Sequence, residues 1–138
     1  MKIDRLLAQI KEWAEAQRDI TGVLLVGSHA RGTGRADSDV DLVILTIQPE
    51  AYLESISFAE RFGSISASQK EDWGRVTSVR VWYEGGPEVE FGFTRPDWAA
   101  PPLDAGTRRV LSDGARVVFD REGWLGRLPG PMEAEHKE

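Results

Sequence analysis

The sequence predicts a mixed α/β domain of the α+β kind, with helices packed on one mixed β-sheet. Two observations lead to this prediction. An amphipathic helical pattern opens the chain, and short apolar runs of strand length follow it between segments rich in turn-forming residues. A length of 138 residues is that of one ordinary domain. We therefore expect one domain over residues 1–128 and a mobile tail over residues 129–138.

The first half of the chain predicts a helix, two strands and a second helix. Residues 3–17 place apolar side chains at helical spacing. Residues 23–26 form a short buried strand. Residues 39–47 form a second strand, which becomes apolar on both faces and so belongs in the centre of a sheet. Pro49 suits the first turn of the second helix, which we expect to end near residue 61.

The second half predicts a loop, a hairpin, a short helix and a last strand. Residues 64–73 are polar and show no clear period, so we expect a loop there. Residues 75–84 alternate between apolar and polar side chains, and residues 88–94 form the returning strand of a hairpin. A short helix over residues 107–111 and a strand over residues 115–119 complete the domain.

The composition excludes several classes of function. The chain has no cysteine and two histidines, which rules out disulfides, thiol nucleophiles and histidine-built metal sites. The net charge of −6 and the lack of a basic cluster argue against a nucleic-acid partner. The apolar runs are too short to span a membrane and no signal-peptide pattern opens the chain, so we expect a cytoplasmic protein without a membrane partner.

A glycine-rich turn follows the first predicted strand. Gly27 lets the backbone approach a ligand closely. Ser28 precedes a short helical segment near residues 29–31, whose N–H groups can face an anion. Arg31 lies on the same face as Ser28 and supplies positive charge for a phosphate. Gly27, Ser28 and Arg31 are therefore the candidate phosphate-binding residues.

Two aspartates open the second predicted strand. Asp39 and Asp41 are two residues apart, so their side chains point to the same side of the strand. Two carboxylates held this close repel each other unless a proton or a cation lies between them. Mg²⁺ prefers carboxylates combined with phosphate oxygens and water. The pair is therefore a candidate magnesium site, with Mn²⁺ as the alternative ion.

Glu90 is the candidate third carboxylate. It lies on the returning strand of the hairpin between two apolar residues that point into the core. Beside Asp39 and Asp41 it would complete a site for two divalent ions, in which Glu90 or a water that it orients takes a proton. Glu84 and Glu88 are nearby alternatives for this role.

Together these motifs resemble a family signature. Gly-Ser-His-Ala-Arg-Gly at residues 27–32 is followed by Ser-Asp-Val-Asp-Leu at residues 38–42. This two-part pattern resembles that of the DNA polymerase β-like nucleotidyltransferase superfamily. Within it, the chain is most similar to the minimal nucleotidyltransferases and the antibiotic adenylyltransferases. The resemblance covers residues 23–45, with Glu90 added as the inferred third acid.

The resemblance implies an enzyme that moves a nucleoside monophosphate from an NTP, with ATP as the default, onto an acceptor. It implies two Mg²⁺ ions as cofactors. The antibiotic adenylyltransferases carry a further helical domain, for which few residues remain after Thr94. We therefore expect a homodimer or a complex with a small helical protein. The resemblance implies catalytic and metal-binding roles for Asp39, Asp41 and Glu90, and triphosphate contacts for Gly27, Ser28 and Arg31.

Three functions stay open at this point. The first is nucleotidylation of a small hydroxylated molecule. The negative net charge of the chain suits a cationic acceptor. The second is an antitoxin-type regulatory protein that binds and adenylylates a small helical toxin. The third is a catalytically silent nucleotide-binding domain.

Simpler explanations of the single motifs also stay open. Gly27 is compatible with an ordinary strand-ending turn, and the aspartate pair with a turn cap. Glu90 alone would be an exposed strand residue, and Arg31 alone a surface ion-pair partner. The sequence leaves undetermined the roles of His29, Arg35, Arg80 and Trp82.

Overall fold

The computed structural model describes residues 3–32, 39–100, 102–123 and 125. The tail that we expect over residues 129–138 lies outside this part of the chain. No helix among the described residues is both long and apolar enough to cross a bilayer. In chain order the elements are α1 (Ile3–Ala16), β1 (Ile20–Val26), α2 (Ser28–Arg31), β2 (Val40–Thr46), α3 (Pro49–Glu54), the 3-10 helix η1 (Ile56–Phe62), β3 (Ile65–Asp72), β4 (Thr77–Tyr83), β5 (Glu88–Thr94), the 3-10 helix η2 (Pro96–Ala99), α4 (Ala105–Ser112) and β6 (Ala115–Asp120).

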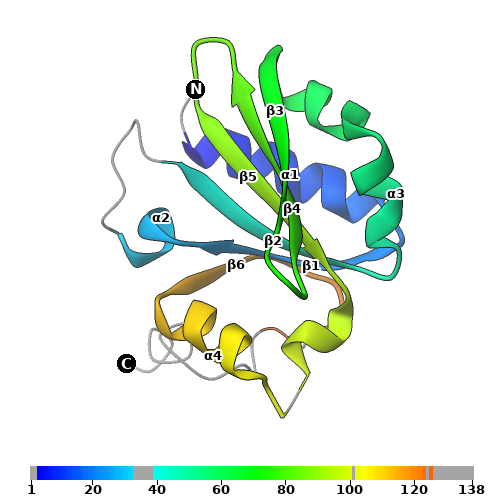
Figure 1. The fold of residues 1–138 in the computed structure, drawn as a ribbon, viewed down its shortest axis with the longest axis vertical. Helices are drawn as coiled ribbons and strands as arrows, with labels where there is room; N and C mark the ends of the chain where they lie inside the picture. The colour runs from blue at the N-terminus through cyan, green and yellow to red at the C-terminus, as the bar shows by residue number, and fades with distance from the viewer. Residues whose placement is uncertain (1–2, 33–38, 101, 124, 126–138) are drawn as a thin grey trace.

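Six strands form one sheet in the order β3-β4-β5-β2-β1-β6 (Figure 1). β2 and β5 run parallel, whereas the other neighbouring strands are antiparallel. β2 lies inside the sheet between β5 and β1, as its two-sided apolar pattern predicts. The predicted fold class, one mixed sheet with helices packed on it, is confirmed.

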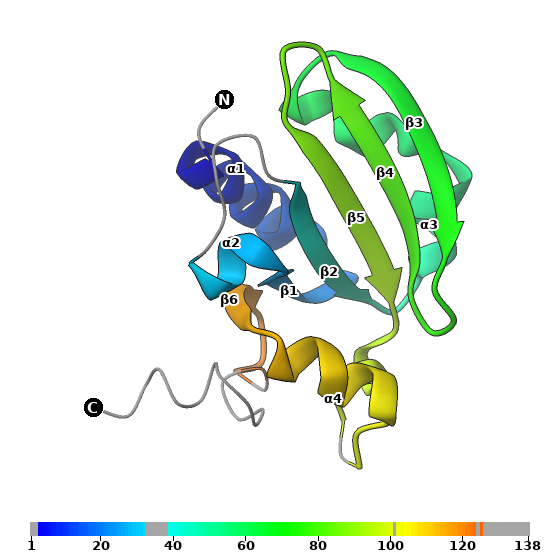
Figure 2. The same ribbon diagram turned by 60° about the vertical axis from the view of Figure 1, so that its left-hand side comes forward.

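The first face of the sheet carries the larger hydrophobic core. α1 and α3 cover this face (Figure 2), and α1 buries the apolar side that its sequence period predicts. Val40, Leu42 and Ile44 of β2 point into this core. Burying apolar surface contributes roughly 25 cal/mol per Å² removed from water, so this packing holds β2 in place. The core includes a group of contacting rings: Trp13, Tyr52, Phe58, Phe62, Phe91 and Phe93.

The second face carries a smaller core and the acidic side chains. Val43 and Leu45 of β2 pack with Trp98 of η2 and Leu111 of α4. α4 lies on this side of the molecule, near β6 (Figure 2). Because strand residues two apart share a face, Asp41 lies on the same face as Val43. The carboxylate therefore lies at the border of this smaller core.

The loop predicted over residues 64–73 is wrong, because β3 occupies this segment. β3 is an edge strand, and most of its side chains are exposed. It pairs with β4 through backbone N–H and C=O groups, which requires no apolar side chains. An edge strand with polar side chains on both sides lacks the alternation by which a strand is predicted.

The single helix predicted over residues 49–61 is two elements, α3 and η1. Ser55 between them has extended backbone angles, with φ −145° and ψ 125°. Its hydroxyl accepts a hydrogen bond from the N–H of Ser57. A serine that bonds to the backbone in this way begins a new helical segment. The apolar spacing continues through the break, so the period alone does not reveal it.

Candidate active site

Asp41 and Glu90 lie side by side on the second face of the sheet. β2 and β5 pair in parallel, and their register places Asp41 directly opposite Glu90. Neighbouring strands are about 4.8 Å apart, and paired side chains share a face. Asp39 precedes β2 by one residue instead of opening the strand, and its side chain is 45% exposed. The strand pairing thus brings the third predicted acid to the aspartate pair.

Burial and neighbouring charges raise the pKa of Asp41 from its ordinary value of 3.8 to about 6. Burial is the largest cause, followed by the negative charges of Glu90 and Asp39, while Arg80 opposes the shift. The pKa of Asp39 is also raised, by burial first and then by the charge of Glu88. Crowded carboxylates favour a proton or a divalent cation between them. The donor chemistry of the aspartate pair therefore fits a divalent metal ion.

Arg80 of β4 is the cation at the centre of the acidic group. Its Nη1 donates to Glu88 at 2.7 Å and to Asp39 at 3.2 Å. Its Nη2 donates to Glu71 and to Glu90, at 3.1 Å in each case. The Arg80 side chain is only 17% exposed, so these attractions are screened less than they would be in water. Arg80 therefore holds together four carboxylates that would otherwise repel one another.

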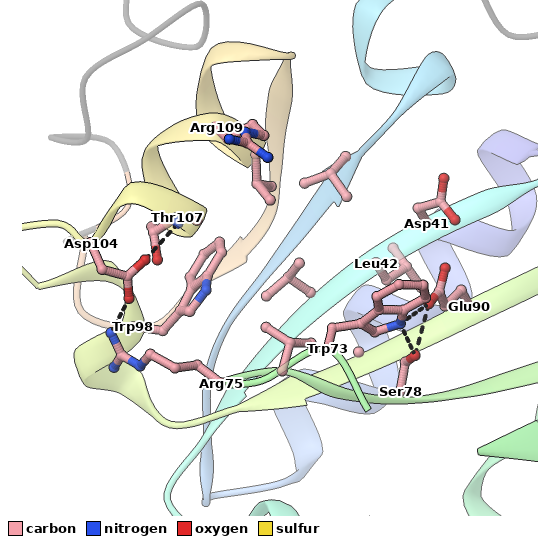
Figure 3. Close-up of a pocket in the computed structure, with 16 residues that line it drawn as sticks. Asp41, Leu42, Trp73, Arg75, Ser78, Glu90, Trp98, Asp104, Thr107 and Arg109 are labelled. Carbon is pink, nitrogen blue, oxygen red and sulfur yellow. Dashed lines mark hydrogen bonds and ion pairs between the residues drawn. The ribbon is translucent and has the colours of Figure 1, made fainter. Parts of the chain in front are cut away.

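Both carboxylate oxygens of Glu90 already have partners. Oε1 accepts from Arg80, and Oε2 accepts from Nε1 of Trp73 at 2.8 Å and from the hydroxyl of Ser78 at 2.7 Å (Figure 3). Within the described residues, no group of three His, Cys, Asp or Glu side chains is arranged to hold a metal ion. Glu90 as a third ligand stays a prediction, and this role requires it to exchange some of these partners for the ion.

Gly27 brings the start of α2 against Asp41. Its φ of 79° lies in the left-handed region, where residues with a side chain are strained. A Cβ built on Gly27 would lie 2.5 Å from Oδ2 of Asp41. Both the backbone angle and the close approach therefore require glycine here. Ser28 follows as the first residue of α2, and the phosphate-binding role of these two residues stays a prediction.

Arg31 lies against the turn between α4 and β6. Its Nη1 donates to the carbonyl oxygen of Asp113 at 3.4 Å. A Cβ on Gly114 would lie 2.7 Å from Cγ of Arg31, so the side chain passes closely over this glycine. The phosphate contact of Arg31 stays a prediction.

A cavity of about 670 Å³ opens beside Asp41 and Glu90 on the second face. This volume lies in the usual range of small-molecule sites. The sheet, η2 and α4 form its walls, which are mainly apolar (Figure 3). Arg75 and Arg109 supply the positive charges among the lining side chains.

Several residues of the site were not predicted from the sequence. Glu71 and Trp73 lie at or beyond the end of β3, in the segment predicted to be a loop. Ser78 has no feature in the sequence that separates it from an ordinary strand serine. Among the residues of undetermined role, Arg80 contacts the acids, and Trp82 pairs with Glu88 on β5. Of the other two, His29 belongs to α2, whereas Arg35 lies outside the described residues.

We expect Asp41 to make the metal-free protein less stable as the pH rises from about 4 to about 6. Its folded-state pKa of about 6 exceeds the ordinary 3.8, so the folded state binds this proton more tightly than the unfolded chain does. The resulting stability is present below about pH 4 and is lost as the pH rises through about 6. Thermal unfolding in EDTA across this range, for the wild type and Asp41→Asn, tests this expectation. The variant should gain in melting temperature relative to the wild type as the pH rises, and a constant difference would contradict the raised pKa.

We expect Arg80→Met to lower the free energy of unfolding by about 2 kcal/mol at neutral pH, because it leaves several half-buried carboxylates without a cation. Arg75→Met is the matched control. Arg75 pairs with Asp97 and Asp104 in more exposed positions, where such pairs contribute about 1 kcal/mol or less. Urea unfolding measures both changes. Equal losses in the two variants would show that the acidic group does not depend on Arg80.

Comparison with known proteins gives one family match and several similar folds. The family model for the nucleotidyltransferase domain matches residues 6–86, which is more than half of the chain. A search of curated proteins finds no match. The matched region contains the glycine-rich turn and both aspartates and ends before Glu90.

Three solved structures illustrate the similarity of fold. An aminoglycoside 6-adenyltransferase from Bacillus subtilis is 16% identical with a TM-score of 0.52, over 69% of this chain and 35% of that one. The polymerase core of TRAMP, an RNA surveillance complex, is 15% identical with a TM-score of 0.51, over 68% of this chain and 31% of that one. A CCA-adding enzyme in complex with CTP is 16% identical with a TM-score of 0.52, over 86% of this chain and 31% of that one. The chain thus spans about a third of the length of each protein, and the likeness shows a shared fold.

Proposed function

This chain belongs to the nucleotidyltransferase domain family, and from this premise we propose that it transfers a nucleoside monophosphate from an NTP, with ATP preferred, onto a hydroxyl group of an acceptor. One observation carries the proposal. The register of β2 and β5 sets Asp41 beside Glu90, and the tight turn at Gly27 touches the same Asp41 carboxylate. The residues predicted to bind metal and the turn predicted to bind phosphate are therefore neighbours on the sheet, which supports the proposal.

We assign the metal-binding role to Asp39 and Asp41, with Glu90 as the third ligand. Mg²⁺ suits these oxygen donors, and Mn²⁺ is the alternative. Two bound ions would stabilise the negative charge that develops on the phosphoryl group and lower the pKa of the attacking hydroxyl. Arg80 keeps the carboxylates close together before metal binds, because it contacts Asp39 and Glu90 at 3.1 to 3.2 Å.

The glycine-rich turn binds the triphosphate in this proposal. Gly27 allows close approach of the backbone, and Ser28 supplies a hydroxyl at the start of α2. Arg31 swings from Asp113 to the phosphates when the nucleotide binds, because a guanidinium pairs more strongly with a phosphate than with a carbonyl oxygen. The β- and γ-phosphates thus lie near α2, and the α-phosphorus lies over the carboxylates.

The transfer itself is one in-line displacement. The acceptor oxygen forms a bond to the α-phosphorus, and the bond from that phosphorus to the bridging oxygen breaks. The electron pair of the broken bond leaves with pyrophosphate. The hydroxyl proton goes to Glu90, or to a water that Glu90 orients.

The test is incubation of the pure protein with Mg²⁺, α-labelled ATP and fractionated lysate of its own host. Label in an extractable small molecule would favour an adenylyltransferase of the antibiotic type. Label in a protein band would favour the antitoxin-type alternative, in which a small helical partner is adenylylated. No transfer with any NTP, together with intact nucleotide binding, would replace the proposal by a silent nucleotide-binding domain.

We further propose that a second chain forms part of the acceptor side, as a homodimer or as a complex with a small helical protein. Light scattering of the pure protein and of the complex recovered from host cells measures these assemblies. A strict monomer that transfers label without any partner would contradict this part of the proposal.

A further inference from the structure

The cavity beside Asp41 and Glu90 is where we infer that the acceptor binds, and the geometry points to a planar aromatic molecule with a hydroxyl group at one end and an anionic group at the other. This inference rests on the proposed function, because only a transferase has an acceptor. The position of the cavity, its aromatic wall and one unpaired positive charge support it.

The cavity reaches Val26, directly before the phosphate-binding turn, and extends from there away from the turn. In the antiparallel pairing of β1 and β2, Val26 lies opposite Asp41, so the chain continues through Gly27 toward the Val40 end of β2. The cavity extends the other way along β2, to Val43. The attacking and leaving oxygens of an in-line displacement lie on opposite sides of the phosphorus. When pyrophosphate leaves toward Gly27, the attacking hydroxyl therefore comes from the cavity.

An ordered and exposed aromatic ring lines this cavity beside the acids. Trp73 is 61% exposed, although hydrogen bonds from its Nε1 to Glu90 and Ser78 hold the ring in place (Figure 3). A fixed ring with open surface offers a partner for a second ring, stacked with an offset or edge to face. Val43 and Val76 continue the apolar wall away from the acids. The body of the acceptor is therefore planar and apolar.

One positive charge in the wall has no counter-charge in the described part of the chain. Arg75 is neutralised, because it contacts Asp104 at 2.7 Å and Asp97 at 2.9 Å. Arg109 of α4 makes no ion pair with another described residue, and Figure 3 shows it across the cavity from Asp41. A carboxylate or phosphate on the acceptor would complete this pair.

This acceptor differs from the cationic one that the net charge of −6 suggests. The charge that a ligand meets is that of the lining side chains, not that of the whole chain. The lining carries the carboxylates of Asp41, Glu90 and Asp104 beside Arg75 and Arg109. Asp104 pairs with Arg75, and the proposed function assigns Asp41 and Glu90 to metal ions, so Arg109 is the lining charge that is left for the acceptor.

Binding of simple probes tests the inference without nucleotide or metal. The probes are 4-hydroxycinnamate and its neutral amide. Calorimetry and the NMR signal of the Trp73 indole N–H, assigned with Trp73→Phe, measure their binding. We expect the carboxylate to bind at least about fivefold more tightly than the amide. Arg109→Gln should remove this preference. Arg108→Gln, its neighbour on α4 and not part of the cavity wall, should retain it.

A cavity-filling variant separates this inference from the proposed function. Val110→Phe, on the α4 side of the cavity, should reduce probe binding at least about tenfold and leave ATP binding in Mg²⁺ within about twofold. A larger loss of ATP binding than of probe binding would mean that the cavity holds the nucleobase and would overturn the inference. If the probes bind but no nucleotidyl transfer occurs, only the proposed function is wrong. If label is transferred but the cavity shows no Arg109-dependent preference for the carboxylate over the amide, only this inference is wrong.

Discussion

Asp41→Asn should reduce nucleotidyl transfer by about 1,000-fold, which corresponds to about 4 kcal/mol of lost transition-state stabilisation. The substitution keeps the size of the side chain and removes the carboxylate charge that lies opposite Glu90 and against Gly27. An amide oxygen binds a divalent cation much more weakly than a carboxylate does, so the variant loses the transition-state stabilisation that the metal ions supply. The measurement is the rate of label transfer from α-labelled ATP at saturating Mg²⁺.

Glu84→Gln is the matched control for this loss of charge. Glu84 is exposed and follows β4, and its backbone N–H bonds to Ser64 without involving the acid side chain. We expect this variant to transfer label within about twofold of the wild-type rate. If Asp41→Asn also transfers at a nearly normal rate, the carboxylates on β2 do not carry the chemistry and the assignment of the site is wrong.

Gly27→Ala should reduce transfer by about 100-fold, although it adds only one methyl group. The new Cβ would lie 2.5 Å from Oδ2 of Asp41, so the carboxylate must move. A misplacement of about 1 Å at a reacting centre typically lowers a rate by about 100-fold. The φ of 79° at Gly27 adds about 1 kcal/mol or more of backbone strain, so a lower melting temperature should accompany the loss of rate.

Gly32→Ala is the control that distinguishes the effect of backbone strain from the effect of displacing the Asp41 carboxylate. Gly32 has nearly the same φ, 80°, but its ψ of 10° is the left-handed conformation that alanine adopts at modest cost, whereas the ψ of −157° at Gly27 is open almost only to glycine. A Cβ on Gly32 would meet no described atom within 4 Å. We expect Gly32→Ala to lose less melting temperature than Gly27→Ala and to transfer label within about threefold of the wild-type rate. Equal loss of rate in the two variants would show that backbone strain in α2, and not the contact with Asp41, limits activity.

The local pattern of the sequence predicts the main elements of this fold because most of them bury one apolar side. The apolar spacing of α1 and the two-sided apolar pattern of β2 follow from their place against the cores. β3 escapes prediction because its stability comes from backbone pairing at the sheet edge. The break between α3 and η1 escapes it because one serine hydroxyl redirects the backbone without changing the apolar spacing.

What the sequence by itself determined is local. The two-residue spacing of Asp39 and Asp41 and the glycine before Ser28 predict a metal-binding and a phosphate-binding role for that segment. Side chains two apart on a strand share a face by geometry alone. No knowledge of the rest of the chain is needed for that conclusion.

Only the tertiary structure decided which distant side chains join this pair. The parallel register of β2 and β5 sets Glu90 opposite Asp41, and the register of β4 and β5 brings Arg80 opposite Glu90. A shift of one residue in either pairing would turn these side chains to the other face. Arg109 reaches the cavity because α4 packs on the second face through Leu111. Strand order, register and helix packing are long-range properties, because they depend on how the whole chain buries its apolar surface and not on any one segment.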